Sequence, residues 1–226
     1  MTSILKADTI QDAAGNNIIN ENANTITIGA SGDTISIPAG ATIANSGTAT
    51  GFGGGMDWLS TTTISSTPSA VAFNNTLITS TYDNYIIIGS NLEPTADCNL
   101  GFGISADNGS SGVAQTYNNS RYTQLNASTQ GFNTSTVTVN GQAGPLIAEL
   151  NDGVLGSFVL QIFNAQATHR GTMLRYESIY ENGGAVPYSL LGATIFSNTS
   201  AINHVQVATS TSTFQTGTVS LYGMRK

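Results

Sequence analysis

A short, imperfect repeat fills the first 50 residues and constrains the fold of that part of the chain more than any other feature. A Thr-Ile or Asn-Ile step recurs every eight or nine residues, at Thr9-Ile10, Asn17-Ile18, Thr25-Ile26, Thr34-Ile35 and Thr42-Ile43. The gaps between these steps hold Gly, Asn, Asp, Ala and Pro, and most of these residues favour tight turns. The spacing therefore predicts, for each unit, a strand of about four residues followed by a turn.

A single unit of this repeat has too little apolar surface to form a core. One or two isoleucines per unit cannot offset the entropy lost when the chain is ordered. Such a repeat must pack on its neighbours or wrap with other chains. We therefore expect a β-repeat shaft over residues 1–46, intertwined in a homotrimer. Its apolar axis is expected to consist of Ile10, Ile18, Ile26, Ile28, Ile35, Ile37 and Ile43.

The composition of the whole chain favours strands over helices. Only 8 % of the 226 residues are charged, whereas Ser, Thr and Asn together make up about a third. The Lys, Glu, Gln and Leu residues that usually fill helices are scarce, while β-branched and aromatic residues are frequent. An apolar content of 39 % argues against disorder. The sequence predicts an all-β protein.

The charge balance and the single cysteine exclude several classes of protein. Six basic and thirteen acidic residues give a net charge of −7, which disfavours nucleic-acid binding. No apolar run is long enough for a membrane-spanning helix, so we expect no membrane insertion, and the N-terminus lacks the apolar core of a signal peptide. Cys98 has no partner for an internal disulfide, and its neighbours give no sign of an activated thiolate. It is interpreted as a structural cysteine.

A glycine-rich segment at 47–56 is predicted to link the shaft to a larger domain at 57–226. Within this domain, turn signals separate eight or nine strand patterns, a spacing typical of a β-sandwich and most consistent with an eight-stranded jelly roll. The continuously apolar run at 158–163 suggests a strand buried on both faces. The other expected strands lie near residues 70–73, 85–88, 100–104, 137–139, 172–180, 205–207 and 219–221.

Two groups of segments resemble parts of known virion proteins. Residues 3–12, 15–20 and 25–33 resemble N-terminal segments of tail-fibre and other virion structural proteins of marine bacteriophages. The runs at 82–88, 91–94 and 217–223 resemble a domain that is often appended to phage fibres. The resemblance implies a virion appendage protein, commonly trimeric, whose N-terminal part faces the particle and whose C-terminal domain faces outward. It transfers no catalytic or receptor-contact residues.

No residue pattern in the chain indicates catalysis or a metal site. His169 and His204 lie far apart in the sequence and have no metal-ligand spacing. Residues 107–110 resemble part of a calcium loop but lack the further carboxylates, so a turn is favoured. Glycoside hydrolysis needs two convergent carboxylates, for which the candidates are Glu149, Asp152, Glu177 and Glu181. Their spacing does not distinguish them from edge-of-strand charges, so we expect no enzymatic activity, no cofactor and no metal.

One stretch has the residue types of a contact surface. Tyr117, Asn118, Asn119, Arg121 and Tyr122 combine aromatic rings, a guanidinium group and adaptable amides, which suit the binding of proteins or sugars. We name these five residues as the candidate ligand-binding patch. The alternative is that Tyr117 and Tyr122 are ordinary strand residues that pack inward.

These observations lead to one functional hypothesis and two alternatives. The hypothesis is a non-enzymatic phage fibre protein, located in the virion, that binds other virion proteins through its N-terminal segment. Its C-terminal β-sandwich would bind a host-surface ligand, such as a glycan, or a partner protein. The first alternative is a capsid decoration or cement protein without host contact, and the second is a glycan-degrading tail spike.

Overall fold

The structure, a computed structural model of the chain, describes residues 9–11, 13–14, 17–22, 25–29, 31–41, 55–110, 118–125, 130–133, 144–168, 171–183, 186–196 and 200–224. These residues form only strands, turns and irregular segments, so they contain no helix that could cross a membrane. The prediction of an all-β protein is confirmed. The chain divides into two compact units, Met1–Phe52 and Gly53–Lys226, and the division falls inside the glycine-rich segment at 47–56.

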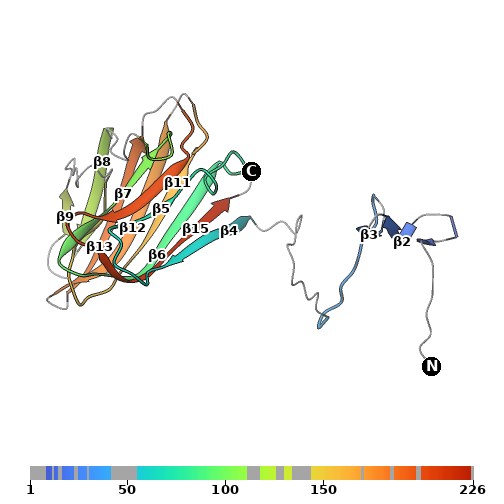
Figure 1. Ribbon diagram of the computed structural model, residues 1–226, viewed down its shortest axis with the longest axis horizontal. Helices are drawn as coiled ribbons and strands as arrows, with labels where there is room; N and C mark the ends of the chain where they lie inside the picture. The colour runs from blue at the N-terminus through green and yellow to red at the C-terminus, as the bar shows by residue number, and fades with distance from the viewer. Residues whose placement is uncertain are drawn as a thin grey trace. The chain divides into compact units, whose positions relative to one another are not determined.

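The first unit contains a three-stranded antiparallel sheet in the order β1-β2-β3 (Figure 1). The strands are β1 (Thr9–Gln11), β2 (Asn17–Asn22) and β3 (Thr25–Ile28). Each begins at or close to one of the Thr-Ile or Asn-Ile steps, as the repeat predicts. In the ladder, Ile19 lies opposite both Ile10 and Ile28.

The fourth unit of the repeat does not form the strand that its sequence suggests. Residues 33–38 are irregular, and the segment is exposed throughout. A strand needs a neighbouring strand to bond its N–H and C=O groups, and Pro38 has no N–H to donate. Within the described part of one chain, no strand pairs with this segment. Ile43 and the side chain of Ile18 lie outside the described residues.

The second unit contains twelve strands among its described residues, more than the eight or nine expected. They are β4 (Met56–Thr63), β5 (Ala70–Phe73), β6 (Asn84–Pro94), β7 (Cys98–Ser105), β8 (Asn118–Leu125), β9 (Gln130–Asn133), β10 (Gly144–Leu150), β11 (Gly156–Phe163), β12 (Thr172–Asn182), β13 (Val186–Phe196), β14 (His204–Thr209) and β15 (Phe214–Met224). The strand expected near 137–139 lies outside the described residues.

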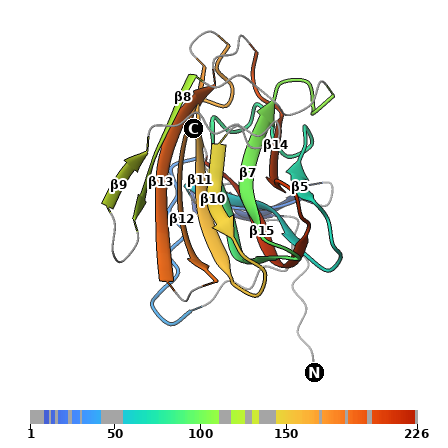
Figure 2. The ribbon, with the colours of Figure 1, turned by 90° about the vertical axis from the view of Figure 1, so that its left-hand side faces the viewer.

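Two antiparallel sheets of unequal size form a sandwich (Figure 2). The smaller sheet has the order β10-β7-β14-β5, and the larger has the order β4-β15-β6-β11-β12-β13-β8-β9. When the hairpins β8–β9 and β12–β13 are left out, eight strands remain: β4, β5, β6, β7, β10, β11, β14 and β15. Renumbered from 1 to 8 in chain order, they have the order 1-8-3-6 in the larger sheet and 2-7-4-5 in the smaller sheet. This is the strand order of a jelly roll, so that prediction is also confirmed.

The two additional hairpins extend one sheet only. β12–β13 is inserted between β11 and β14, and β8–β9 is inserted between β7 and β10. Both join the larger sheet beyond β11, where β13 pairs with β8. The larger sheet therefore has twice as many strands as the sheet that packs against it.

The core lies between the two sheets. Side chains on β6 and β11 alternate toward it. On β7, Leu100, Phe102 and Ile104 are fully buried, as the sequence predicts, and the residues between them are buried as well. The prediction that β11 is buried on both faces is wrong. Phe158 is buried, but Val159 and Phe163 are 38 % and 36 % exposed, because β11 lies inside the larger sheet with only one face against the smaller sheet.

Aromatic rings pack directly over glycines of the larger sheet. A Cβ atom on Gly192 would lie 2.1–2.4 Å from ring atoms of Tyr176, and one on Gly89 would lie 2.2 Å from the ring of Phe158. Tyr176 is buried and also contacts Phe102, at a ring-centroid distance of 5.4 Å. These glycines therefore hold the space that the aromatic side chains fill.

We predict that Gly192→Ala destabilises the protein by about 1–3 kcal/mol, because the new methyl group forces Tyr176 out of its position in a packed core. Urea unfolding followed by circular dichroism measures the change. Gly55→Ala is the control, since nothing lies within 4 Å of its Cβ position. Equal stability of the two variants would contradict the packing argument.

Candidate functional site: a polar cleft

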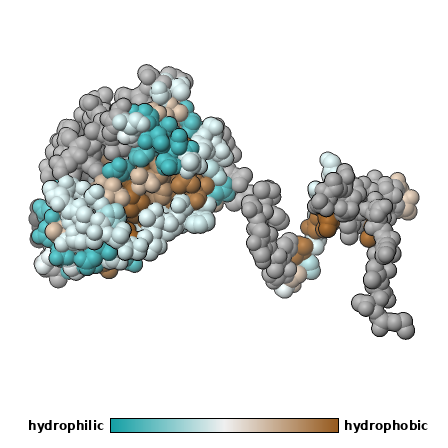
Figure 3. Space-filling view, viewed as in Figure 1, coloured by the Kyte–Doolittle hydropathy of each residue, from teal (hydrophilic) through white to brown (hydrophobic). Residues whose placement is uncertain are grey.

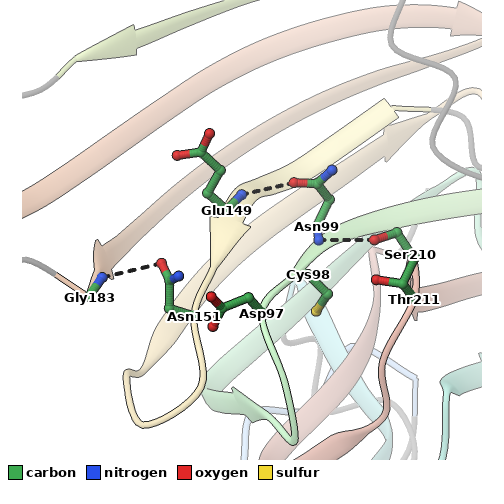
Figure 4. Close-up of a pocket in the computed structure, with 8 residues that line it drawn as sticks. All are labelled: Asp97, Cys98, Asn99, Glu149, Asn151, Gly183, Ser210 and Thr211. Atoms are coloured by element: carbon green, nitrogen blue, oxygen red, sulfur yellow. Dashed lines mark hydrogen bonds between the residues drawn. The ribbon is translucent and has the colours of Figure 1, made fainter.

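A polar cleft of about 660 Å³ opens where several turns of the second unit meet (Figure 4). It is lined by Asp97, Cys98, Asn99, Glu149, Asn151, Gly183, Ser210 and Thr211. The antiparallel pairing explains the location. β7 begins at Cys98, and its neighbours β10 and β14 end beside it, with Leu150 opposite Cys98 and Thr209 opposite Leu100. The turns that follow β10 and β14 therefore lie near the start of β7.

Asn99 connects three of these segments. Its backbone N–H donates to Ser210 Oγ at 3.0 Å, and its carbonyl accepts from the Ser210 N–H at 2.8 Å. Its side-chain Oδ1 accepts from the backbone N–H of Glu149 at 2.9 Å. The wall of the cleft formed by β7, the end of β10 and the β14–β15 loop is thus fixed by hydrogen bonds.

Two more polar side chains hold turns in place. Asp97 Oδ1 accepts from the backbone N–H of Asp152 at 2.9 Å, and Asn151 Oδ1 accepts from the backbone N–H of Gly183 at 3.2 Å. A carboxylate has a second oxygen, and a carboxamide also carries an NH₂ donor group. The cleft therefore combines hydrogen-bond donors and acceptors suited to a hydroxyl-rich ligand.

Glu149 occupies a left-handed backbone conformation, with φ of 63°. For a residue other than glycine this conformation costs on the order of 1–3 kcal/mol and is often found at functional sites. It coincides with a register irregularity in the β10–β7 ladder between Ile147 and Leu150. The exposed Glu149 side chain points away from Asp97 and Asn151 (Figure 4). The two carboxylates of the cleft therefore do not face each other as a hydrolytic pair would.

Cys98 is the apolar element of the cleft. The residue is buried, and burial, with a smaller contribution from the negative charge of Asp97, raises the pKa of its thiol to about 11. At neutral pH the thiol is protonated and unreactive. The environment fits the structural role that the sequence predicts.

The four carboxylates considered for glycoside hydrolysis do not gather at one site. Glu149 lines the cleft, and Asp152 lies in the adjoining turn. Glu177 lies on β12 and borders a different hollow together with Ile179, and Glu181 is exposed near the end of the same strand. Sequence spacing does not reveal this separation, because strand order decides which turns and faces meet.

The ligand patch expected from sequence lies on a different part of the second unit. Tyr117 lies outside the described residues. Asn118, Asn119, Arg121 and Tyr122 belong to β8, which pairs with β13 on one side and with β9 on the other. Their side chains are not among those described, so the patch remains a prediction.

His204 and the turn at 107–110 lie together. Ser105 Oγ donates to Asp107 Oδ1 at 2.7 Å and accepts from the Gly109 N–H at 2.8 Å, which closes a turn at the end of β7. His204 is buried beneath Gly109. Burial lowers the pKa of the imidazole below its ordinary value, against the opposing effect of the Asp107 charge. Among the described residues, no group of three or more Asp, Glu, His or Cys side chains could hold a metal, and His169 lies outside them.

Of the residues that line the cleft, the sequence singled out Glu149 and Cys98, neither of them as a ligand-binding residue. Asp97 and Asn99 flank Cys98 at the start of β7, whereas Asn151 and Ser210 follow β10 and β14, and these four residues share no motif. Their only common sequence signal is that each is a small polar residue at or near the end of a strand, which also describes many ordinary turn residues.

No protein-family model, curated protein or solved structure matches this chain. The resemblance of the N-terminal repeat to phage fibre proteins therefore remains a hypothesis.

We predict that iodoacetamide alkylates Cys98 of the folded protein at least about 100-fold more slowly than an unstructured cysteine peptide at pH 8. A pKa near 11 in place of the ordinary 9.0 lowers the thiolate fraction by about this factor, and burial slows the reaction further. Mass spectrometry of a time course measures the rate. The same protein in urea is the control and should react at the peptide rate. Rapid alkylation in the folded state would show an activated thiol.

We also predict that His204 reduces stability at acid pH. Its pKa in the folded state is below the ordinary 6.5, so the unfolded chain takes up a proton that the folded chain does not as the pH falls below 6.5. The unfolding free energy then falls by up to about 1.4 kcal/mol per pH unit, until the folded-state pKa is reached. Urea unfolding at pH 7.5 and pH 5 should show a smaller loss for His204→Leu than for the parent. An equal loss in both would contradict this assignment.

Proposed function

We propose that the protein is a non-enzymatic bacteriophage fibre protein. The N-terminal unit forms a trimeric shaft that attaches to the particle, and the jelly roll binds a host-surface glycan or a partner protein. The observation that carries the proposal is a contrast in burial between the two units. The jelly roll buries its own core, whereas five isoleucines among the described residues of the small N-terminal unit are exposed.

Five isoleucines of the first unit are exposed, three of them in the sheet and two in the irregular segment at 33–38. Part of this apolar surface is visible in Figure 3. The exposed fractions are 38 % for Ile10, 68 % for Ile26, 56 % for Ile28, 60 % for Ile35 and 48 % for Ile37. Exposed apolar side chains in a row next to open strand edges favour aggregation unless another chain covers them. Three copies arranged around an axis would cover these five isoleucines and would also provide a strand partner for residues 34–38, which pair with no strand in the described part of one chain.

The cleft supports a binding role for the second unit. Its acceptors and donors suit sugar hydroxyl groups, while the divergence of Glu149 and Asp97 argues against a paired-carboxylate hydrolase. One such polar site binds weakly. Three heads per fibre and several fibres per particle increase the overall affinity, because each bound head raises the effective concentration of the next head.

The particle itself provides the test that separates a fibre from a decoration protein or a tail spike. We expect the chain in purified virions, and cryo-electron microscopy should place it at the tip of an appendage. A location flat on the capsid surface would favour the decoration protein. Incubation of the purified protein with host polysaccharide should release no new reducing ends, and their release would establish a tail spike.

We predict that the full-length protein is a trimer, with three times the chain mass of 23.3 kDa in light scattering coupled to size exclusion. The double variant Ile26→Asn/Ile28→Asn should be monomeric at micromolar concentration, because polar side chains replace part of the apolar axis. The matched control is Thr25→Asn/Thr27→Asn, in which the alternate residues of the same exposed strand are changed. A monomeric parent protein would overturn the shaft proposal.

A further inference from the structure

The outer face of the larger sheet is unusually apolar. Strands β11, β12 and β13 alternate strictly, so every second side chain points away from the core. Six outward side chains are apolar and exposed, with exposed fractions of 38 % for Val159, 36 % for Phe163, 43 % for Met173, 64 % for Ile179, 45 % for Leu191 and 46 % for Ile195. We refer to these six residues as the outer apolar face.

The pairing register brings three of these residues together. Met173 lies opposite Phe163 on one side and Ile195 on the other, which gives one apolar row across three strands. Val159, Ile179 and Leu191 lie around Glu177, and Arg175 separates them from this row. Val159 also lies opposite Ile88 on the neighbouring strand β6. Together the six side chains expose on the order of 500 Å², an area comparable with the largest apolar patches of monomers. A standard interface covers about 800 Å² per partner, so this face with its polar rim is large enough to form one.

The charges of this face suit a second copy of the same chain. Arg175 and Glu177 are both exposed and lie two residues apart on β12, between Met173 and Ile179. Gln161 and Ala193 flank Arg175, while Val159 and Leu191 flank Glu177. Glu181 lies at the rim, near the end of the strand. When two copies of such a face meet, the positive charge of one copy can lie against the negative charge of the other.

We propose that the three heads of one fibre pack around the three-fold axis through the outer apolar face, with Arg175 of each copy paired to Glu177 of the next. This inference rests on the trimeric fibre proposed above. In a cyclic arrangement the three β12 strands run in the same direction along the axis. Positions two residues apart on a strand are separated by about 7 Å. An arginine side chain is long enough to span this distance. A hollow of about 270 Å³ beside Ile179, lined in part by Ile88 and Val159, can receive an apolar side chain of the neighbour.

The contact is expected to form when the shaft holds the heads together. Tethering raises the effective concentration of the heads to the millimolar range, so a contact too weak to associate free monomers is still occupied within a fibre. The face is distinct from the polar cleft, whose lining residues include none of its six members.

Labelling of an introduced cysteine in the full-length protein tests the inference. Leu191→Cys places a thiol within the face, while the native Cys98 is buried and contributes little background. We expect maleimide to label this thiol at least about tenfold more slowly in the trimer than in the monomeric Ile26→Asn/Ile28→Asn background. The control is Ala72→Cys, an exposed position on β5 of the smaller sheet, which should label at the same rate in both.

Charge reversal then tests the pairing. Arg175→Glu in the Leu191→Cys protein should make labelling fast while the size of the trimer is unchanged, because three added negative charges repel at the axis. Adding Glu177→Arg restores the opposite charges and should restore slow labelling. Fast labelling of Leu191→Cys in an intact trimer would overturn the head contact and leave the shaft proposal standing. A monomeric full-length protein would overturn both the head contact and the shaft proposal. The mass of the particle in solution, trimer or monomer, distinguishes these two outcomes.

Discussion

A two-layered β-sandwich has one core, and that constraint organises everything else in the second unit. Each strand has two faces, and only the face toward the opposite sheet can be buried by the fold itself. The inward residues of β11, such as Phe158 and Ile162, fill the core, while its outward residues Val159 and Phe163 remain partly exposed. Apolar residues on the outward face therefore contribute less to the stability of the single chain than the inward residues do. Their presence on the outer face indicates that a partner covers them.

The inserted hairpins enlarge this effect. The eight-stranded core of the jelly roll would have a four-stranded outer face, but β12–β13 and β8–β9 extend the larger sheet on one side. Most of the exposed apolar residues lie on this extension or on β11 beside it. The same extension depends on close packing inside the sandwich, since Gly192 on β13 leaves room for the ring of Tyr176 on β12.

The polar cleft lies at an end of the sandwich, where the turns between strands are found. Turns collect there because antiparallel strands begin and end at the same edge, and turn residues are mostly small and polar. Asn99, Asp97 and Asn151 use one oxygen each to hold a backbone N–H, so their remaining polar groups are fixed in position before any ligand arrives. Preorganisation of this kind lowers the entropic cost of binding. It fits the binding role proposed for the second unit.

Local chemistry indicated seven of the twelve strands described in the second unit, whereas β4, β8, β9, β10 and β13 were not among the expected strands. The alternation of Leu100, Phe102 and Ile104 predicted a strand with a buried face, and the scarcity of helix-forming residues predicted the all-β class. The spacing of strands and turns was sufficient to indicate the jelly roll. These features depend on neighbours in the sequence, and they can be read from it.

Contacts between distant segments were decided only by the tertiary structure. The apolar run of β11 is compatible with burial on one face or on two, and only its place inside the larger sheet shows that one face is exposed. Glu149 and Glu177 look equivalent in the sequence, yet one lines the cleft and the other lies on the outer face. Asn99 meets Ser210 across 111 positions of the chain because β7 and β14 are neighbours. Strand order is a property of the whole sheet, so no local pattern of residues encodes where such side chains meet.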